Sequence, residues 1–299
     1  MNQKKPHVTY YTNTFNRRYL LENMLKSFDC CNLYDGSYEW IITDYGSTDS
    51  TRDFLIDYAS KVAGVTLVLG DEKSYIEELE RRNLAPANQR KKSHAIFGLS
   101  RNAARKLAKG DLFVEIADDH QFIRRGDWIS DAINITADRV EKYGLDDISS
   151  IIYRGLSIDR IYKQNNETEP EEKISQSCSY FVAKHKCYDD YHIQKMSVFE
   201  KIGDYFEPHT LTGEIGDQWR EGKDNINHYV DYLGRTKAAK MKKIFMKFPY
   251  AIDFPNPWHA KLNVPHTELI FPILEKDEIQ KRCNHLDRPV STDEILGLQ

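Results

Sequence analysis

The chain has 299 residues, and its 42 Lys and Arg residues against 46 Asp and Glu residues leave a formal net charge of -4 at pH 7. This balance excludes a protein that binds nucleic acid through a strongly basic surface. Hydrophobic residues make up 40% and charged residues 29% of the chain, which excludes a wholly disordered protein and indicates a sizeable core. The length corresponds to one large domain or two ordinary ones.

The sequence leads us to expect neither a secretion signal nor a membrane-spanning segment. No apolar run near the N-terminus has the length of a signal peptide, and no stretch approaches about 18 consecutive apolar residues. The five cysteines lack the CxxC spacing of zinc and redox sites. Reduced thiols in a cytoplasmic protein are therefore expected.

The first 120 residues alternate short apolar runs with amphipathic stretches. Strands are predicted at 7–12, 39–43, 65–69 and 112–116, and helices at 19–28, 51–62 and 99–109. Strands joined by helical crossovers are normally parallel, so the pattern predicts an α/β fold with a doubly wound, mainly parallel sheet flanked by helices. Ligands of such sheets bind beyond the carboxyl ends of the strands, so the chemistry is expected in the loops that follow them.

The second half of the chain is less regular. An apolar run lies at 148–153, residues 177–183 predict a strand, and residues 196–202 predict a short helix. The polar run at 164–173 (QNNETEPEEK) predicts an exposed loop or a flexible lid. Near residue 231 the composition changes to lysines interleaved with apolar residues, followed by a proline-rich stretch. This change divides a domain at 1–230 from a helical or irregular C-terminal extension at 231–299.

The segment 237–248 (KAAKMKKIFMKF) combines lysines with apolar residues at i, i+3, i+4 and i+7. These apolar residues are Met241, Ile244, Phe245 and Phe248. The spacing predicts a basic amphipathic helix. Such a helix could lie on an anionic membrane surface, and packing of its apolar face on the rest of the chain is the alternative.

An acidic turn, Asp44 to Asp49 (DYGSTD), follows the second predicted strand. A carboxylate at the end of a strand, followed by Gly46, can accept hydrogen bonds from a base or a ribose while the backbone stays close. The alternative is a capped turn in which Ser47 or Asp49 begins the next helix.

The segment 117–120 (ADDH) ends the fourth predicted strand. Its two carboxylates and one imidazole are suitable ligands for a divalent metal such as Mn²⁺ or Mg²⁺, whose charge could be shared with a bound diphosphate. The alternative is a solvated acidic loop in which His120 has only a structural, capping role.

Three segments in this order, VTYYTNTFNR, YEWIITDYGSTDST and SRNAARKLAKGDLFVEIADDH, resemble the nucleotide-binding half of family-2 glycosyltransferases of the GT-A fold. The resemblance covers residues 7–130. It implies that Asp44 holds the base and that Arg101 lies near the nucleotide or its phosphates. The full set of implied nucleotide-binding residues is Thr12, Asn13, Thr14, Asn16, Asp44, Arg101 and Asp118. Asn13 replaces the family's proline and Tyr45 its second aspartate, so the preferred base stays open.

The resemblance also implies a metal site at the family's DXD motif. In one register Ala117 takes the first position of that motif, so the first carboxylate is missing; in the other, Asp118 and His120 are the ligands of a D-x-H motif. Asp118, Asp119 and His120 are therefore all candidate ligands, with Asp119 favoured. His228 is a further candidate from the second half of the chain.

Two later segments, SVFEKIGDYFE and TGEIGDQWREG, resemble the acceptor region of the same family and its acidic motif ahead of an arginine. The position of Arg220 places Glu214 on the family's catalytic carboxylate, with Asp217 one helical turn later. An inverting transfer needs such a base, because the acceptor hydroxyl loses its proton as it attacks. The alternative is an exposed helix carrying two acids three residues apart.

The resemblance implies a metal-dependent inverting glycosyltransferase. It would transfer a sugar from a nucleotide-sugar donor, with a UDP-sugar favoured, to a hydroxyl of a glycan or lipid-linked acceptor in surface polysaccharide synthesis. The expected place is the cytoplasm, peripheral on the inner face of the membrane through 237–248. The alternatives are a catalytically inactive nucleotide- or carbohydrate-binding module and a nucleotidyltransferase, although TNTFNRR lacks the glycine-rich phosphate loop of the latter.

Overall fold

The computed structural model of the chain describes residues 5–81, 89–122, 124–143, 148–153, 171–183, 192–198, 242–247 and 250–253. Its elements in chain order are β1 (Val8–Thr14), α1 (Arg18–Cys31), β2 (Tyr38–Asp44), α2 (Thr51–Lys61), β3 (Val65–Leu69), α3 (Glu72–Arg81), α4 (Gln89–Leu107), β4 (Leu112–Glu115), β5 (His120–Phe122), α5 (Trp128–Tyr143), β6 (Ile148–Ile152), β7 (Glu171–Ile174), β8 (Ser179–Ala183), β9 (Ile193–Lys195), β10 (Lys242–Met246) and β11 (Ala251–Asp253).

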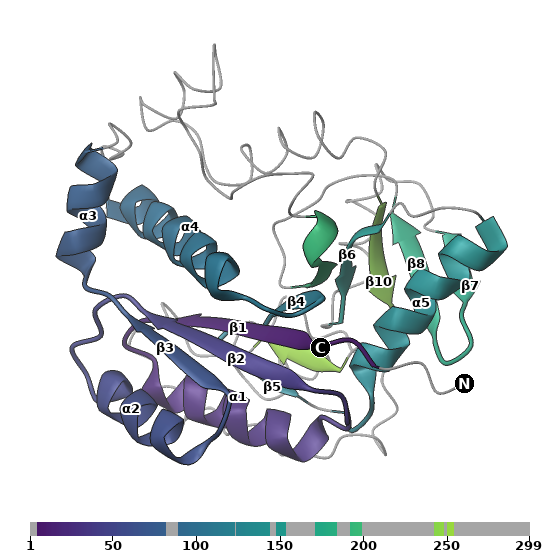
Figure 1. Cartoon of the computed structure of the whole chain (residues 1–299), viewed down its shortest axis with the longest axis horizontal. Helices are drawn as coiled ribbons and strands as arrows, with labels where there is room; N and C mark the ends of the chain where they lie inside the picture. Colours follow the sequence, from purple (N-terminus) through teal and green to yellow (C-terminus); the bar gives the residue numbers. More distant parts are fainter. Residues whose placement is uncertain are drawn as a thin grey trace, which may run out of the picture.

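Within the described ranges, a sheet of nine strands in the order β3-β2-β1-β4-β9-β6-β10-β8-β7 forms the centre (Figure 1). The first four strands in this order are all parallel. β9 runs antiparallel to both of its neighbours, and β10 is parallel to β6 but antiparallel to β8. A separate two-stranded antiparallel sheet joins β11 to β5. The predicted α/β fold is confirmed as a mixed, mostly parallel sheet flanked by helices.

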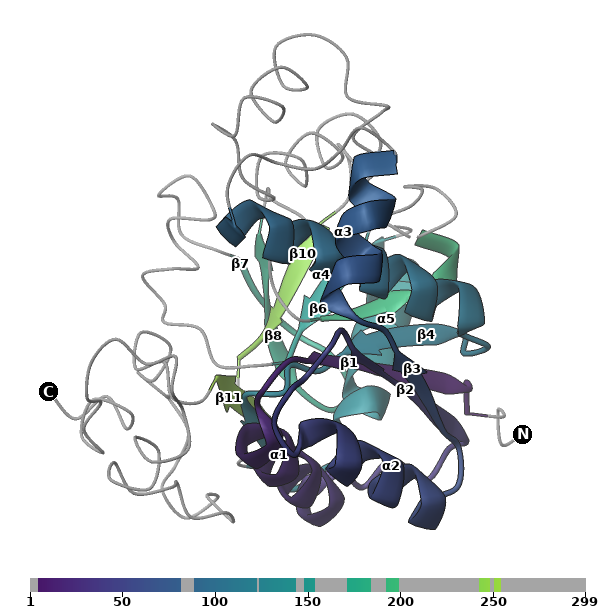
Figure 2. The ribbon, with the colours of Figure 1, turned by 90° about the vertical axis from the view of Figure 1, so that its left-hand side faces the viewer.

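The strand order reverses between β1 and β4. The chain runs from β1 through α1 to β2 and through α2 to β3, and then returns through α3 and α4 to pair β4 with the other side of β1. α1 and α2 lie on one face of these strands, and α3 and α4 lie on the other (Figures 1 and 2). The carboxyl ends of β1 and β4 therefore meet at a topological switch point, where open α/β sheets bind their ligands.

The face of the sheet toward α1 holds an aromatic core. Tyr10 of β1 packs edge-on against Phe28 of α1 with ring centroids 5.0 Å apart, and Phe28 contacts Trp40 of β2 at 4.6 Å. Successive residues of a strand point to opposite faces, so Tyr11 faces α4 instead. Its buried hydroxyl lies 3.2 Å from Ser100 Oγ, and burial raises the pKa of Tyr11 to about 12.

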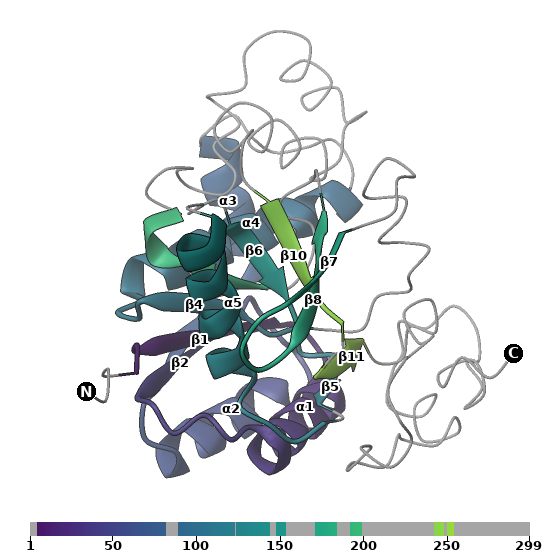
Figure 3. The same cartoon turned by 90° about the vertical axis from the view of Figure 1, so that its right-hand side faces the viewer.

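α5 covers the part of the sheet that contains β6, β10 and β8 (Figure 3). The hydroxyl of Tyr180 in β8 donates a 2.8 Å hydrogen bond to Asp138 in the middle of this helix. None of the helices in the described ranges combines the length and the hydropathy needed to cross a membrane.

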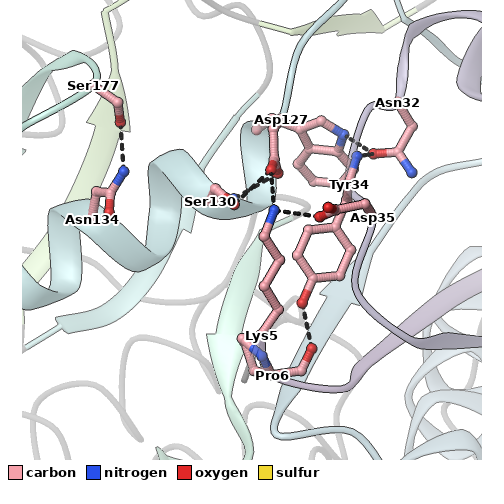
Figure 4. A network of polar contacts seen from close by, with 10 residues as sticks. Lys5, Pro6, Asn32, Tyr34, Asp35, Asp127, Ser130, Asn134 and Ser177 are labelled. Carbon is pink, nitrogen blue, oxygen red and sulfur yellow. Dashed lines mark hydrogen bonds and ion pairs between the residues drawn. The ribbon is translucent and has the colours of Figure 1, made fainter. Parts of the chain in front are cut away.

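A polar network ties the segment before β1 to the start of α5 (Figure 4). Lys5 Nζ lies 2.8 Å from Asp127 Oδ2 and also pairs with Asp35. The Asp127 carboxylate accepts bonds from the backbone N and the hydroxyl of Ser130, at 3.0 and 2.6 Å, and so caps α5. Hydrogen bonds to Asp127 and Asp35 raise the pKa of Lys5. This network fixes the amino end of β1, at the opposite end from the switch point.

The predicted strands and the first three predicted helices are confirmed; β3 has the predicted bounds, and the bounds of the other elements differ. The largest difference is in α4, which begins at Gln89 rather than at residue 99. The polar run at its start has no apolar periodicity, so sequence pattern alone placed the beginning of the helix too late. Residues 196–198 are helical, and the rest of the helix predicted at 196–202 lies outside the described residues.

The prediction of an amphipathic helix at 237–248 is wrong for residues 242–246, which form β10. The adjacent side chains of Ile244 and Phe245 are both buried, because β10 lies inside the sheet and has neighbours on both faces. A five-residue strand buried on both faces has no strict alternation to distinguish it from a helix. The helical face on which the membrane contact was predicted is therefore absent from these residues.

Two further differences concern the second half. The loop predicted at 164–173 is wrong for its last residues, since β7 begins at Glu171 and pairs with β8. β10 and β11 follow residue 231, yet they pair with strands that precede it. The described part of the C-terminal extension is thus built into the same two sheets as the rest of the chain.

Candidate functional site

The candidate site lies at the carboxyl edge, which we define as the loops after β1, β2 and β4 (residues 15–17, 45–50 and 116–119). Thr14 pairs with Asp44 at the ends of β1 and β2, and Tyr11 pairs with Glu115 at the end of β4. Because the three strands are parallel neighbours, their loops leave the sheet side by side. This places the three segments that resemble the glycosyltransferase family at one edge.

Asn16 joins the first two of these loops. Its φ of +53° lies in the left-handed region, which asparagine tolerates better than most residues. Its Oδ1 accepts hydrogen bonds from the backbone N of Thr48 at 2.7 Å and of Asp49 at 3.2 Å, and its own N donates to Ser47 Oγ at 2.8 Å. Asn16 was predicted to lie beside the nucleotide, and the structure shows that its amide oxygen holds the acidic turn.

Asp44 is buried and anchors the same turn. Its Oδ1 accepts a 3.0 Å bond from Ser47 N, and its Oδ2 pairs with Arg52 Nε at 2.8 Å. Arg52 also bonds the carbonyl oxygen of Gly70 after β3. The carboxylate that was predicted to hold the base therefore fixes the turn, and through Arg52 it connects the ends of β2 and β3.

An aromatic pair was missed by the sequence reasoning. Phe15 and Tyr45 follow the ends of two neighbouring strands, and their half-buried rings stack with centroids 4.9 Å apart and an interplanar angle of 7°. Tyr45 was expected only to replace an aspartate of the family's motif. An aromatic residue directly after each of two parallel strands was the signal that could have revealed the pair.

The last residues of β1 differ in their burial and hydrogen bonding. The Thr12 hydroxyl accepts a 3.2 Å bond from the indole of Trp40, which makes it a core residue. Thr14 Oγ1 is buried and has no hydrogen-bond partner among the residues that the structure describes. A buried hydroxyl without a partner costs about 1–3 kcal/mol. Thr14 and the half-buried Asn13 are therefore better placed than Thr12 to contact a ligand.

Arg101 of α4 forms a buried ion pair with Glu115 at the end of β4. Only 6% of the arginine side chain and 1% of the glutamate side chain are exposed. Arg101 was predicted to lie near the nucleotide or its phosphates. The structure shows that its guanidinium is engaged with a carboxylate of the sheet, where it connects α4 to β4.

The acidic corner, by which we mean Asp118 and Asp119, lies at the switch point. Arg17, at the start of α1, reaches across from the end of β1. Its Nη1 lies 2.9 Å from Asp118 Oδ1 and 3.4 Å from Asp119 Oδ2. Two carboxylate oxygens therefore converge on one cationic nitrogen.

His120 lies beside the acidic corner but is directed into the protein. It is fully buried, and its Nδ1 lies 3.1 Å from the Tyr153 hydroxyl. That hydroxyl donates its only proton to the carbonyl oxygen of Glu115 at 2.7 Å. Nδ1 must therefore carry the proton of the His120–Tyr153 hydrogen bond, and in the neutral ring the lone pair lies on Nε2.

The chemistry of the acidic corner fits a divalent cation that is shared with phosphate. Within the described ranges, no group of three or more His, Cys, Asp or Glu side chains could hold a metal by itself. Mg²⁺ and similar ions, however, commonly use one or two carboxylates together with the phosphates of a substrate. Glu214, Asp217 and His228 lie outside the described residues, so their predicted roles stay predictions.

Comparison with known proteins gives matches among solved structures alone, since no family model and no curated protein matches the chain. The mannosyltransferase PcManGT from Pyrobaculum calidifontis, in complex with GDP-Man and Mn²⁺, is 16% identical with a TM-score of 0.42, over 67% of this chain and 48% of that one. S. aureus TarS 1–349 is 12% identical with a TM-score of 0.47, over 87% and 67% of the two chains. The chain thus spans about half the length of the mannosyltransferase.

Proposed function

We propose that the chain is a metal-dependent inverting glycosyltransferase that transfers a sugar from a nucleotide-sugar, with a UDP-sugar favoured, to a hydroxyl of a glycan or lipid-linked acceptor. The observation that carries this proposal is the convergence of Asp118 and Asp119 on one cationic nitrogen at the switch point between β1 and β4. A convergent pair of carboxylates at this position suits a cation that bridges to a diphosphate.

The donor's base would be bound by the loops after β1 and β2. The stacked rings of Phe15 and Tyr45 offer a flat apolar surface on which a nucleobase can stack. The Thr14 hydroxyl and the Asn13 amide supply polar contacts at the end of β1. Asp44 acts in this proposal through the turn that it anchors, because its two carboxylate oxygens already bond Ser47 and Arg52.

A divalent cation, Mn²⁺ or Mg²⁺, would supply positive charge to offset the charge that grows on the leaving nucleoside diphosphate. Asp118 and Asp119 would hold it. His120 is the third candidate ligand: Tyr153 orients its ring and sets its tautomer, as partners of metal-binding histidines commonly do. His228 stays a candidate from the sequence.

The acceptor hydroxyl needs a base, and Glu214 is the residue proposed for this role, with Asp217 in reserve. The carboxylate would take the hydroxyl proton as the oxygen attacks the anomeric carbon from the side opposite the diphosphate, so the configuration inverts. Both residues lie outside the described part of the chain, so this assignment rests on the sequence resemblance.

A catalytically inactive nucleotide-binding module is the second candidate. It is favoured by Ala117, which takes the place of the first carboxylate in one register of the family's metal motif. Such a module would use the same loops to bind a nucleotide but would not turn over a donor.

Release of nucleoside diphosphate from a panel of nucleotide-sugars with Mn²⁺ tests the proposal. We expect release from one donor, and the Glu214→Gln variant should lower the rate by about 10²- to 10⁴-fold. Calorimetric titration with UDP, with and without Mn²⁺, runs in parallel. Metal-dependent binding without release from any donor would favour the inactive module, and the absence of all nucleotide binding would overturn both candidates.

A further inference from the structure

Arg17 occupies a position that depends on its neighbour in the chain. Asn16, held in the left-handed conformation by its bonds to the turn at 47–49, reverses the direction of the chain after β1. Arg17 is the N-cap residue directly before α1, and its carbonyl oxygen accepts a 3.0 Å bond from Leu21 N. The backbone of Arg17 is therefore fixed, while its side chain extends over the switch point toward the loop after β4.

The same carboxylate oxygens face both Arg17 and any cation that would enter the acidic corner. Nη1 lies 2.9 Å from Asp118 Oδ1 and 3.4 Å from Asp119 Oδ2, so it stands where a metal shared by these oxygens would stand. A guanidinium and a divalent ion repel each other and cannot share this point. Arg17 is 33% exposed, which leaves its side chain room to move away.

We propose that Arg17 is an exchangeable counter-ion for the acidic corner. Before a donor binds, its guanidinium holds the Asp118 and Asp119 carboxylates. When a divalent cation enters with the donor, Arg17 yields the carboxylates and moves its guanidinium onto the phosphate oxygens of that donor. This proposal deepens the proposed function of the same site and rests on it.

Charge explains both positions of the Arg17 guanidinium, on the carboxylates and on the phosphates. Without a counter-ion, two adjacent carboxylates repel each other, and Asp118 is only 5% exposed to water that could screen it. Once the metal holds the carboxylates, the guanidinium needs another anion. Phosphate oxygens match the planar fork of arginine and accept two parallel hydrogen bonds from it. Arg17 therefore competes with the metal but cooperates with the diphosphate.

The neighbouring arginine provides a matched control. Arg18 Nη1 donates a 3.1 Å bond to Ser50 Oγ, and its guanidinium lies 5.6 Å from the centre of the Phe54 ring. It thus belongs to the contact between α1 and α2. Replacement of Arg18 by alanine removes the same charge from the neighbouring position and leaves the ion pairs of Asp118 and Asp119 with Arg17 in place.

The test measures two ligands on the wild type and on the Arg17→Ala and Arg18→Ala variants. Mn²⁺ binding without nucleotide is followed by electron paramagnetic resonance of the free ion, and UDP binding at saturating Mn²⁺ is followed by calorimetry. Relative to Arg18→Ala, we expect Arg17→Ala to bind Mn²⁺ about 3- to 10-fold more tightly. The same variant should bind UDP about 10-fold more weakly.

Three outcomes separate the parts of the proposal. Equal Mn²⁺ affinity in the two alanine variants would overturn the competition. Tighter Mn²⁺ binding with unchanged UDP affinity would overturn the movement to phosphate. If neither the wild type nor any variant binds a nucleotide, but Arg17→Ala still binds Mn²⁺ more tightly, the proposed function fails while the counter-ion role of Arg17 is supported.

Arg17→Lys keeps the charge. Its affinities for Mn²⁺ and for UDP should lie between those of the wild type and of Arg17→Ala, and it replaces the alanine variant if that one does not fold.

Discussion

Two arginine–carboxylate pairs, Arg101 with Glu115 and Arg17 with Asp118, use carboxylates three residues apart in the chain. The arginines of the two pairs differ in exposure. Arg101 and Glu115 are both almost fully buried, with side-chain exposures of 6% and 1%. Arg17 is 33% exposed where it meets the buried Asp118. The first pair cannot separate without leaving a charge in the protein interior, whereas the second can exchange its arginine for another cation from solvent.

This difference in exposure distinguishes a structural pair from a pair that can bind a ligand, within the site predicted from the sequence. Glu115 is the last residue of β4, and Asp118 follows three residues later at the switch point. Both arginines belong to the segments that resemble the glycosyltransferase family. Burial, which the sequence does not reveal, makes one pair a structural connection between α4 and β4 and leaves the other available for a ligand.

Loss of the buried Arg101–Glu115 pair should reduce stability the most. Arg101→Met should lower the free energy of unfolding by about 3–5 kcal/mol, because Glu115 would remain as an uncompensated buried charge. Arg17→Met should lower it less, by about 1 kcal/mol, since Arg17 is partly exposed and a cation from solvent can take its place beside Asp118. Urea unfolding followed by circular dichroism measures both values. Equal losses in the two variants would show that burial of the arginine does not determine the cost of losing it.

A double variant sharpens the same test. In Arg101→Met/Glu115→Leu both charges are gone, and well-packed apolar pairs often replace buried ion pairs at little cost. Most of the stability lost in Arg101→Met should therefore return. If the double variant is no more stable than the single one, the contacts of the Arg101 side chain, rather than the unpaired glutamate, account for the loss.

A third pair combines a carboxylate as buried as that of the first pair with an arginine as exposed as that of the second. Asp44 is fully buried, whereas the side chain of its partner Arg52 is 34% exposed. Asp44→Asn should cost about 2 kcal/mol of unfolding free energy, because the amide presents its NH₂ group either to the backbone N–H of Ser47 or to Arg52, and neither can accept a hydrogen bond.

Asp57→Asn is the matched control for this variant. Asp57 is exposed on α2 and pairs only with Lys61 one turn away at 2.7 Å, among the contacts that the structure gives for it. Its replacement should have a much smaller effect in the same urea titration. A loss for Asp57→Asn as large as that for Asp44→Asn would show that burial does not set the cost.

A smaller effect, visible in the pH dependence of stability, is expected at Asp138 of α5. Burial by itself raises the pKa of this carboxyl, but hydrogen bonds from Lys142 at 2.5 Å and Tyr180 at 2.8 Å hold the pKa below its ordinary value of 3.8. A carboxyl with a lowered pKa in the folded state stabilises the protein above its unfolded pKa, and this stability is lost as the pH falls through the folded value.

The difference in unfolding free energy between wild type and Asp138→Asn should therefore be constant above about pH 5 and shrink below about pH 4. Urea unfolding at a series of pH values between 6 and 3 measures it. A difference that stays constant to pH 3 would show that the pairing at Asp138 does not lower its pKa. Asp138 is a buried carboxylate with an exposed cationic partner, Lys142, so the test applies the contrast between buried and exposed ion pairs to a pair outside the site.

The first half of the fold could be predicted because its strands and crossover helices each have a clear period. Tyr10 and Tyr11 face opposite sides of the sheet, and the alternation around them marks β1. β10 could not be predicted in the same way. Ile244 and Phe245 are buried on opposite faces of a strand inside the sheet, and the neighbours that bury them are far away in the sequence.

The location of the site could also be predicted, but its internal pairing could not. The acidic corner and the turn at Asp44 both follow strands, and the parallel fold brings their loops together. The contact between Arg17 and Asp118, however, spans 101 residues and depends on the direction that Asn16 gives to the chain. The roles of Arg17 and Arg101 follow from burial and distance, which only the folded chain defines.

The smallest effect concerns two adjacent thiols, which test the contrast between buried and exposed groups without altering a charge. Cys30 is exposed and Cys31 is buried in α1. Burial raises the pKa of Cys31 to about 11, so at pH 8 only about one molecule in a thousand carries the reactive thiolate at this position. Iodoacetamide at pH 8 should therefore modify Cys30 and spare Cys31, as read by mass spectrometry of the peptide that contains both. The same reaction in urea should modify both thiols. Equal modification of the two in the native protein would show that Cys31 is not buried, and would contradict the packing of α1 on the aromatic core.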